Sequence, residues 1–245
     1  MREIAARRLL PAYRIDRTPG WTAAAIRNGS LCKGQNMLAE TAALSPLYGD
    51  NKGASRPRWH FGPASGKARG TVEQFIAAGF LKAYQARLTE FMPELMGLYQ
   101  DAALVAACGL RGAATGPLFL EQYLDHSADV ALSRLIGAPE DRSRIIEVGN
   151  LSVSRPGYAR HFVAWLTSHL HSAGMHWALF SAVPALRNNF RRLGIPMITL
   201  GPADPDRLAR HVRASWGTYY DQQPQVTAVH VATAFETLGL TRCRQ

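Results

Sequence analysis

Residues 154–160, SRPGYAR, have the composition of a phosphate-binding turn. They follow an apolar run at residues 145–153 and precede an amphipathic segment. The first backbone N–H groups of a helix are unpaired and lie at its positive end, where they bind phosphate. An ordinary turn at the start of a helix would look the same, so both interpretations stay open. The residues expected to contact phosphate are the small or cationic members of the turn and their neighbours: Ser154, Arg155, Gly157, Tyr158, Ala159 and Arg160.

The turn lies within an alternation of strands and helices. The runs MHWALFSAV and PALRNNFRRLGI, at residues 175–183 and 184–195, predict a second strand and a second helix. Upstream, apolar spacing predicts a helix from Thr71, followed by a hairpin that turns near Asp101. Downstream, a helix from about Pro205 and a strand at residues 225–232 are expected. This order predicts an α/β or α+β fold with a mixed sheet.

The positive charge is concentrated near the N-terminus. The formal net charge is +10, and residues 1–70 hold 12 Lys and Arg against 4 Asp and Glu, a surplus of 8. Residues 1–66 are also rich in Gly, Pro and Ser and show no sustained period. We therefore expect a basic, largely disordered segment at residues 1–66 and one domain at residues 67–245. The nearly balanced charge of that domain argues against nucleic-acid binding.

The cysteines and histidines do not have the spacing of a metal site. Cys32, Cys108 and Cys243 are far apart and no CxxC occurs, which argues against a zinc site or a disulfide framework. The eight histidines form no ligand set either. Residues 1–14 contain no apolar stretch long enough for a signal peptide, and the sequence has no run of about 18 uncharged apolar residues. We expect a cytoplasmic protein with no membrane span and no permanently bound cofactor.

Two landmarks around the turn resemble the Gcn5-related N-acetyltransferase (GNAT) superfamily. Leu151-Ser152-Val153 leads into the turn, and Leu193-Gly194-Ile195 ends the second helix. The superfamily's loop usually begins with Gln or Arg, whereas this one begins with Ser154. The resemblance implies a GNAT-like mixed, mostly antiparallel sheet flanked by helices, and an enzyme that uses acyl-CoA or another pantetheine thioester.

Four longer strings resemble the thermostable haemolysin family, and this resemblance covers roughly residues 69–232. They are GLR at 109–111, LFLEQYLD at 118–125, EVGNLS at 147–152 and WGTYYDQQPQV at 216–226. The family name describes a phenotype and not a reaction. We therefore give the acyltransferase implied by the GNAT resemblance more weight.

The GNAT resemblance implies roles for residues of the strand before the turn and of the helices after it. Glu147 lies on the strand that separates from its neighbour to admit the thioester, and it is expected to act as general base, with a structural salt bridge as the alternative. Backbone N–H groups near Leu151 and Val153 are expected to polarise the thioester carbonyl. The side chains expected along the pantetheine arm, unless they are ordinary polar residues of a strand edge or helix surface, are Asn150, Asn188 and Asn189.

The residue that would protonate the leaving thiolate does not follow directly from the resemblance. Many relatives carry a tyrosine where this chain has Phe190. Tyr219 or Tyr220 is expected to supply the hydroxyl instead, although packing with a hydrogen bond at the tip, or an unassisted thiolate, would also fit.

The acceptor is expected on elements that precede the core strand. The candidate residues there are Arg111, Glu121 and Tyr123, with an Arg111–Glu121 ion pair as the alternative role. The expected reaction is direct attack by the amine of a small molecule on an acyl-CoA or acyl-carrier-protein thioester, with a fatty acyl group favoured.

Three arginines at helical spacing bear on the choice of donor. Arg207, Arg210 and Arg213 form either a solvated face or a docking stripe for an acidic acyl carrier protein. Two other functions stay open: a membrane-active haemolysin without enzymatic activity, and a nucleic-acid-associated protein that acts through its basic tail.

Overall fold

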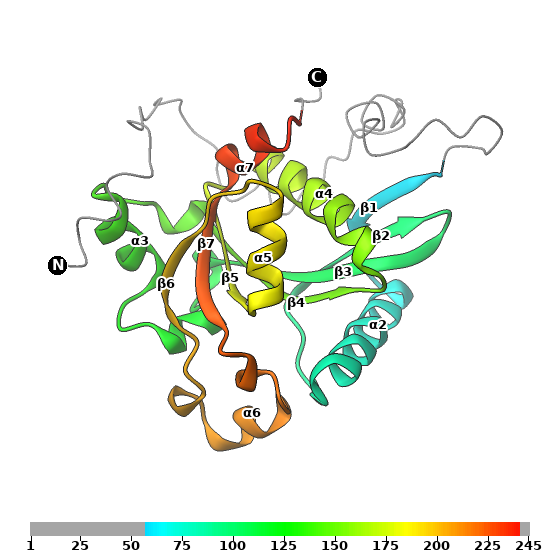
Figure 1. Cartoon of the computed structure of the whole chain (residues 1–245), viewed down its shortest axis with the longest axis horizontal. Helices are drawn as coiled ribbons and strands as arrows, with labels where there is room; N and C mark the ends of the chain where they lie inside the picture. The colour runs from blue at the N-terminus through cyan, green and yellow to red at the C-terminus, as the bar shows by residue number, and fades with distance from the viewer. Residues whose placement is uncertain (1–56, 241–245) are drawn as a thin grey trace.

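The computed structural model describes residues 57–240, which form a seven-stranded mixed sheet flanked by helices (Figure 1). The strand order is β1-β2-β3-β4-β5-β7-β6. Neighbouring strands are antiparallel except β4 (Ile145–Val153) and β5 (Trp177–Ala182), which are parallel. The expected fold class, a mixed and mostly antiparallel sheet with flanking helices, is confirmed.

Residues 59–63 are part of the sheet, although they were expected to lie in the disordered segment. They form β1 (Trp59–Pro63), which pairs with β2 (Glu94–Gln100) at the edge of the sheet. Gly and Pro suggested a loop here, but an edge strand tolerates proline. Trp59 is buried, and its ring stacks on His161 at 4.7 Å between centroids. The fold thus begins before residue 67, while residues 1–56 lie outside the described part of the chain.

The hairpin that turns near Asp101 is confirmed. β2 and β3 (Ala103–Gly112) form an antiparallel pair, joined by Asp101 and Ala102 with φ of 48° and 70°. Two successive residues with positive φ are characteristic of a tight hairpin turn whose twist matches that of the strands.

Helices cover both faces of the sheet, and Figure 1 shows α2 and α4 on opposite sides of it. α4 (Ala159–Ser172), α5 (Pro184–Arg192) and α7 (Val231–Thr237) share an apolar core on one face. α2 (Lys67–Tyr84), the helix predicted from Thr71, packs on the other face. That face is completed by α3 (Ala128–Ile136) and the 3₁₀-helix η5 (Phe119–Tyr123). Alternate residues of each strand supply the two cores.

The C-terminal part differs in detail from the sequence prediction. The helix expected from Pro205 is a 3₁₀ turn, η8 (Pro205–Arg207), followed by α6 (Arg210–Ser215), and both connect β6 (Ile198–Pro202) to β7 (Gln225–His230). The strand expected to reach residue 232 ends at His230, whose ring accepts a hydrogen bond from the Thr233 N–H. This cap starts α7, whose first residues, Val231 and Ala232, the sequence pattern had assigned to the strand.

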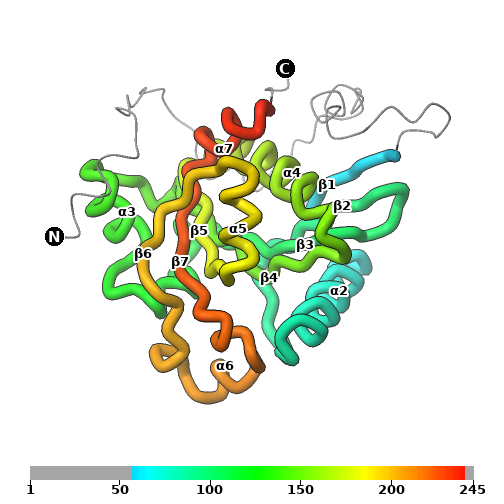
Figure 2. Tube along the Cα trace, viewed as in Figure 1, coloured from blue at the N-terminus to red at the C-terminus, as the bar shows by residue number. Residues whose placement is uncertain are grey.

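β4 and β5 separate after a short paired stretch. Their register covers only Ile145, Ile146 and Glu147 on β4 and Trp177, Ala178 and Leu179 on β5. Beyond it β4 continues beside β3 and β5 beside β7, and Figure 2 shows the two traces running apart. The facing edges of these two strands are therefore not paired with each other past Glu147 and Leu179.

Candidate functional site

A bulge in β4 follows the point where β4 leaves β5. The register between β3 and β4 shifts between Ala107 and Gly109, which places one extra residue on β4. Asn150 lies at the bulge with φ of 50°, and its Oδ1 accepts the Met92 backbone N–H at 2.9 Å. A bulge redirects a strand and interrupts its ladder, and such features are frequent beside active sites. The Asn150 side chain thus anchors the bulge, and its contact with a pantetheine arm stays a prediction.

Glu147 is a buried carboxylate where the two strands part. It is 3% exposed, and its two oxygens accept the backbone N–H groups of Phe119 at 2.8 Å and Leu120 at 3.1 Å. Burial raises the pKa of Glu147 to about 7 and outweighs these two hydrogen bonds, which lower it. No cation within residues 57–240 forms an ion pair with Glu147, so the salt-bridge alternative does not apply to that part of the chain. A carboxylate with this pKa can accept a proton at neutral pH.

Glu121 has a different environment. Arg142 binds both of its carboxylate oxygens, at 2.5 and 2.9 Å, and also contacts Asp129. The backbone N–H groups of Leu118 and Ala128 donate to the same carboxylate. Burial raises the pKa of Glu121, but the hydrogen bonds from Arg142 and the two amides outweigh burial and hold it below its ordinary value. Glu121 is thus engaged in a structural network, which leaves it poorly placed for the expected role in binding an amine.

Arg111 does not form the ion pair with Glu121 that was considered as an alternative. In the β3–β4 ladder it lies opposite Glu147, and directly opposed residues of an antiparallel pair point to the same face. Arg111 is partly buried, and its positive charge lowers the pKa of Glu147 without any ion pair between them. The structure therefore brings together Arg111 and Glu147, which lie 36 residues apart in the sequence.

Tyr219 and Ser181 form a hydrogen-bonded pair on the same face. The Tyr219 hydroxyl lies 2.9 Å from Ser181 Oγ and donates to the Ser181 carbonyl at 3.2 Å. Ser181 lies two residues past Leu179, the last residue of β5 that pairs with β4, so its side chain shares the face of Leu179 and Glu147. Burial raises the pKa of Tyr219 well above its ordinary value. Tyr219 thus holds its proton tightly and is suited to donating a hydrogen bond.

Tyr220 and Tyr123 form a second pair, with 2.5 Å between their hydroxyl oxygens. Burial raises the pKa of both phenols, that of Tyr220 to about 12. The charge of Glu147 contributes to the shift at Tyr123, so these tyrosines belong to the surroundings of the carboxylate. A cluster of aromatic rings in mutual contact adjoins these tyrosines: Phe80, Tyr84, Phe119, Trp216 and Tyr219.

The turn at residues 154–160 lies at the end of β4 and leads into α4. Its central residues form a single 3₁₀ turn, η7 (Pro156–Tyr158). The side chains of Arg155 and Arg160 are exposed, and a Cβ at Gly157 would meet no atom within 4 Å. The turn is open on this side, as phosphate binding would require. No ligand contact tests the individual residues, so their role stays a prediction.

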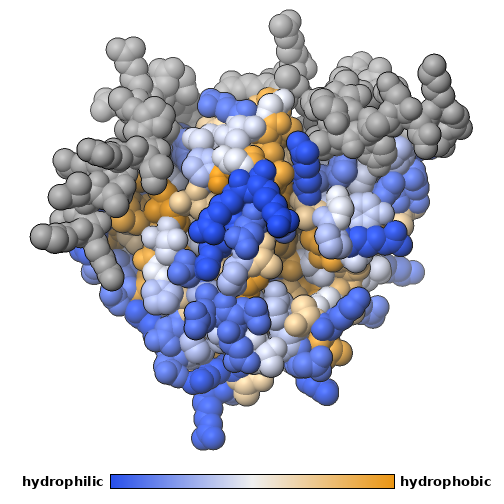
Figure 3. Space-filling model, viewed as in Figure 1, coloured by the Kyte–Doolittle hydropathy of each residue, from blue (hydrophilic) through white to orange (hydrophobic). Residues whose placement is uncertain are grey.

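The α5 residues separate into an exposed and a packed set. Figure 3 shows hydrophilic side chains over α5. Asn188 is exposed and accepts a hydrogen bond from Arg191, whereas Asn189 is partly buried. Phe190 stacks on Phe180 at 5.2 Å between centroids, within the apolar core of that face. Phe190 is therefore a packing residue, whereas the Ser181 and Tyr219 hydroxyl groups lie on the opposite face of the sheet.

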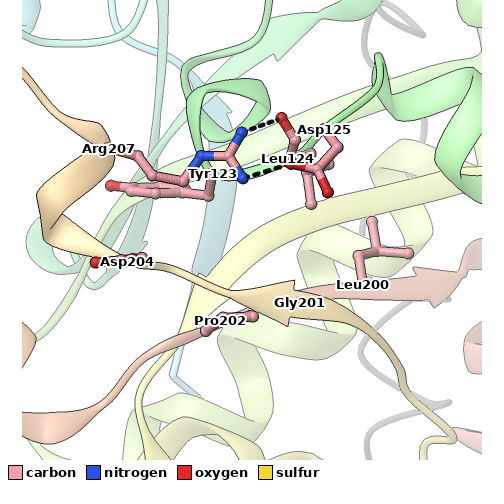
Figure 4. A pocket seen from close by; sticks show the side chains of 8 residues that line it. All are labelled: Tyr123, Leu124, Asp125, Leu200, Gly201, Pro202, Asp204 and Arg207. Atoms are coloured by element: carbon pink, nitrogen blue, oxygen red, sulfur yellow. Dashed lines mark hydrogen bonds and ion pairs between the residues drawn. The ribbon is translucent and has the colours of Figure 1, made fainter.

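A cavity of about 290 Å³ lies between β6 and the segment after η5 (Figure 4). Arg207 crosses it and donates to Asp125 Oδ1 and to the Leu124 carbonyl, both at 2.8 Å. Arg213 pairs with Asp206. Two of the three arginines considered as either a solvated face or a carrier-protein docking stripe therefore form exposed ion pairs with neighbouring carboxylates.

Sequence reasoning missed Ser181, Arg142 and Trp216. Ser181 is the one polar residue in the run Trp177–Ala182, and that interruption of an apolar strand was an available signal. Arg142 binds Glu121, which lies 21 residues away in the sequence, and no local sequence pattern predicts such a contact. Among residues 57–240 there is no cluster of three metal-ligating side chains, and no helix there is long and apolar enough to cross a membrane.

Comparison with known proteins gives a family and a fold. The family model for "Thermostable hemolysin" matches residues 63–235. The AHL synthase LasI superposes with a TM-score of 0.51 at 12% identity, over 78% of this chain and 100% of LasI. Apo TofI gives 0.51 at 12% identity, over 76% of this chain and 98% of TofI. At these identities the likeness concerns the fold alone. No curated protein sequence matches this chain.

Proposed function

The chain belongs to the thermostable hemolysin family, and from this premise we propose that it is an N-acyltransferase. It moves an acyl group, with a fatty acyl group favoured, from acyl-CoA or acyl carrier protein to the amine of a small molecule. The observation that carries the proposal is the buried Glu147 carboxylate, with a pKa of about 7, at the point where β4 and β5 separate. The name of LasI, an AHL synthase of the same fold, is consistent with acyl transfer.

The donor is proposed to lie between β4 and β5. Past Glu147 and Leu179 the facing strand edges are not paired with each other, so their backbone groups are available to the amides of a pantetheine arm. The turn at residues 154–160 follows at the end of β4, where phosphate groups of CoA or of a carrier protein would meet the start of α4. Backbone N–H groups near Leu151 and Val153 would polarise the thioester carbonyl.

Glu147 is proposed to act as general base. The amine nitrogen attacks the thioester carbonyl carbon, the carbon–sulfur bond breaks, and the proton lost by nitrogen passes to Glu147, directly or through water. The hydrogen bonds from Phe119 and Leu120 keep the carboxylate oriented, and each oxygen keeps a second lone pair for that proton. The departing thiolate takes up a proton from solvent or from protonated Glu147, which regenerates the carboxylate, and the products are an amide and a free thiol.

The leaving sulfur is proposed to be stabilised by Ser181. Tyr219 donates to Ser181 Oγ or to the Ser181 carbonyl, and the Ser181 hydroxyl is then able to donate to the thiolate. The raised pKa of Tyr219 argues against full transfer of its proton. This arrangement takes the place of a tyrosine at position 190, where Phe190 packs in the core.

The test is free-thiol release by the purified full chain. A panel of acyl-CoAs and acyl carrier proteins of increasing chain length is offered with pooled amines, and donor binding is followed by native mass spectrometry. We expect release with one donor class, lost in Glu147→Gln and retained in Glu236→Gln, an exposed control on α7. If no thioester is bound or consumed, the acyltransferase proposal is wrong.

A further inference from the structure

Arg111 differs from the other arginines that are partly buried in residues 57–240. These are Arg69, Arg111, Arg142, Arg144 and Arg187. Four of them donate hydrogen bonds to, or contact, a carboxylate, a carbonyl oxygen or a histidine ring: Arg69, Arg142, Arg144 and Arg187. Within the same part of the chain Arg111 has no such partner. Its guanidinium nitrogens are not among the buried atoms that lack a partner in this part of the chain, so they remain accessible and are able to donate to a ligand.

Neither neighbouring carboxylate forms an ion pair with Arg111. Glu121 is bound by Arg142 through both oxygens. Glu147 directs its oxygens to the N–H groups of Phe119 and Leu120, although it lies opposite Arg111 in the ladder. The site thus holds one engaged carboxylate base beside one cation whose hydrogen-bonding capacity is unused.

We infer that Arg111 binds a carboxylate of the acceptor, so that the acceptor is an amino acid. This inference rests on the proposed acyltransferase function. A guanidinium presents two parallel N–H groups that match a carboxylate, and Arg111 shares its face with Glu147. A substrate whose carboxylate binds Arg111 would hold its amine beside the base. The ligand is therefore a zwitterion whose two charged groups are separated by only a few bonds.

The experiment uses matched acceptors with the full chain and a fixed donor. Each amino acid is compared with its amide and with the amine left by removing its carboxyl group, and thiol release gives KM and kcat separately. A wild-type preference for the free carboxylate is expected. Arg111→Gln should raise KM for the amino acid about 100-fold, the effect of losing a charge-assisted bidentate contact, and have a much smaller effect on the decarboxylated amine. Loss of the Arg111 charge also raises the pKa of Glu147, but this effect is common to both acceptors, so the ratio of the two changes is the readout. Arg111→Lys should be intermediate, and exposed Arg134→Gln is the matched control.

Two outcomes overturn the inference alone. One is equal use of amino acids and decarboxylated amines by the wild type, which needs no variant to fold. The other is an equal loss for both acceptors in Arg111→Gln, which would indicate a structural or purely electrostatic role. Absence of thiol release with every amine would instead overturn the acyltransferase proposal, and the inference with it. Preference for an amine bearing a phosphate in place of the carboxylate would also contradict the assigned acceptor class.

Discussion

Two glutamates hold the same short helix, η5, in opposite electrostatic environments. Glu121 accepts the Leu118 N–H at the start of η5. Glu147, which lies on β4, accepts the next two N–H groups of η5, those of Phe119 and Leu120. Arg142 neutralises Glu121 through two hydrogen bonds, whereas Glu147 has no ion pair among residues 57–240. The difference separates a carboxylate that stabilises the fold from one whose proton affinity is tuned near neutrality.

The pKa values follow from that difference. At Glu121 burial acts against ionisation, but Arg142 and two backbone amides reverse its effect, and the pKa stays below its ordinary value. At Glu147 burial dominates, and the pKa rises to about 7. Only the second carboxylate is able to exchange a proton at physiological pH, which is the property that a general base needs.

Substitution of the two glutamates should give the largest contrast. Glu147→Gln is expected to lower kcat/KM for thiol release by roughly 10²- to 10⁴-fold, because the base is lost. Glu121→Gln should instead lower the thermal unfolding midpoint and change kcat/KM much less. Glutamine keeps only one acceptor oxygen, so Glu147→Asp, which retains a carboxylate, is measured beside it. Equal activity losses in both positions, each following the loss of stability, would mean that Glu147 is a structural cap as well.

The pH dependence of the reaction should follow Glu147. The base must be ionised to accept a proton, so kcat/KM should fall about tenfold for each pH unit below about 7. Near pH 5 the loss would reach about 100-fold. The profile is measured for the wild type, Glu121→Gln and Glu147→Gln with one acceptor, so that titration of the acceptor is common to all three. The fall of kcat/KM at low pH should persist in Glu121→Gln and disappear from the residual activity of Glu147→Gln.

Removal of Arg142 should destabilise the network around Glu121 and leave the environment of Glu147 unchanged. Arg142→Met leaves the partly buried carboxylates of Glu121 and Asp129 without their cation. We expect the free energy of unfolding to fall by about 2 kcal/mol, below the loss for a fully buried pair because Arg142 is partly exposed. Chemical denaturation of Arg142→Met and of exposed Arg134→Met measures this loss. A change no larger than that of Arg134→Met would show that the backbone amides alone hold Glu121.

The same contrast shows what the sequence allows one to predict. The hairpin at Asp101, the helix at Thr71 and the strands around the turn were predictable, because local turn chemistry and apolar periodicity encode them. Glu147 was identified through its place on a strand of recognisable pattern. Glu121 was assigned to substrate binding because its partner Arg142 lies 21 residues away in the sequence and contacts it only in the tertiary structure.

Two further features could not be predicted because they also depend on long-range contacts. β1 has the composition of a loop and becomes a strand only because β2 offers an edge and α4 packs on Trp59. The acid role of Tyr219 stays a prediction, but its hydrogen bond to Ser181, a residue from another element, was not foreseen. Neither pairing can be predicted from neighbouring residues, although Ser181 stands out as a polar residue in an apolar strand.

Ser181 extends the comparison to the β5 side of the separated strands, since it lies on the same face of the sheet as Glu147. Ser181→Ala should lower kcat about tenfold, the effect of losing one hydrogen bond to the leaving sulfur, and leave the acceptor KM unchanged. The loss should shrink with donors whose thiol is more acidic, because a better leaving group needs less stabilisation. Tyr219→Phe should give a smaller loss, since it acts through Ser181. A loss that is independent of thiol acidity would place Ser181 outside the bond-breaking step and confine the chemistry to the β4 side.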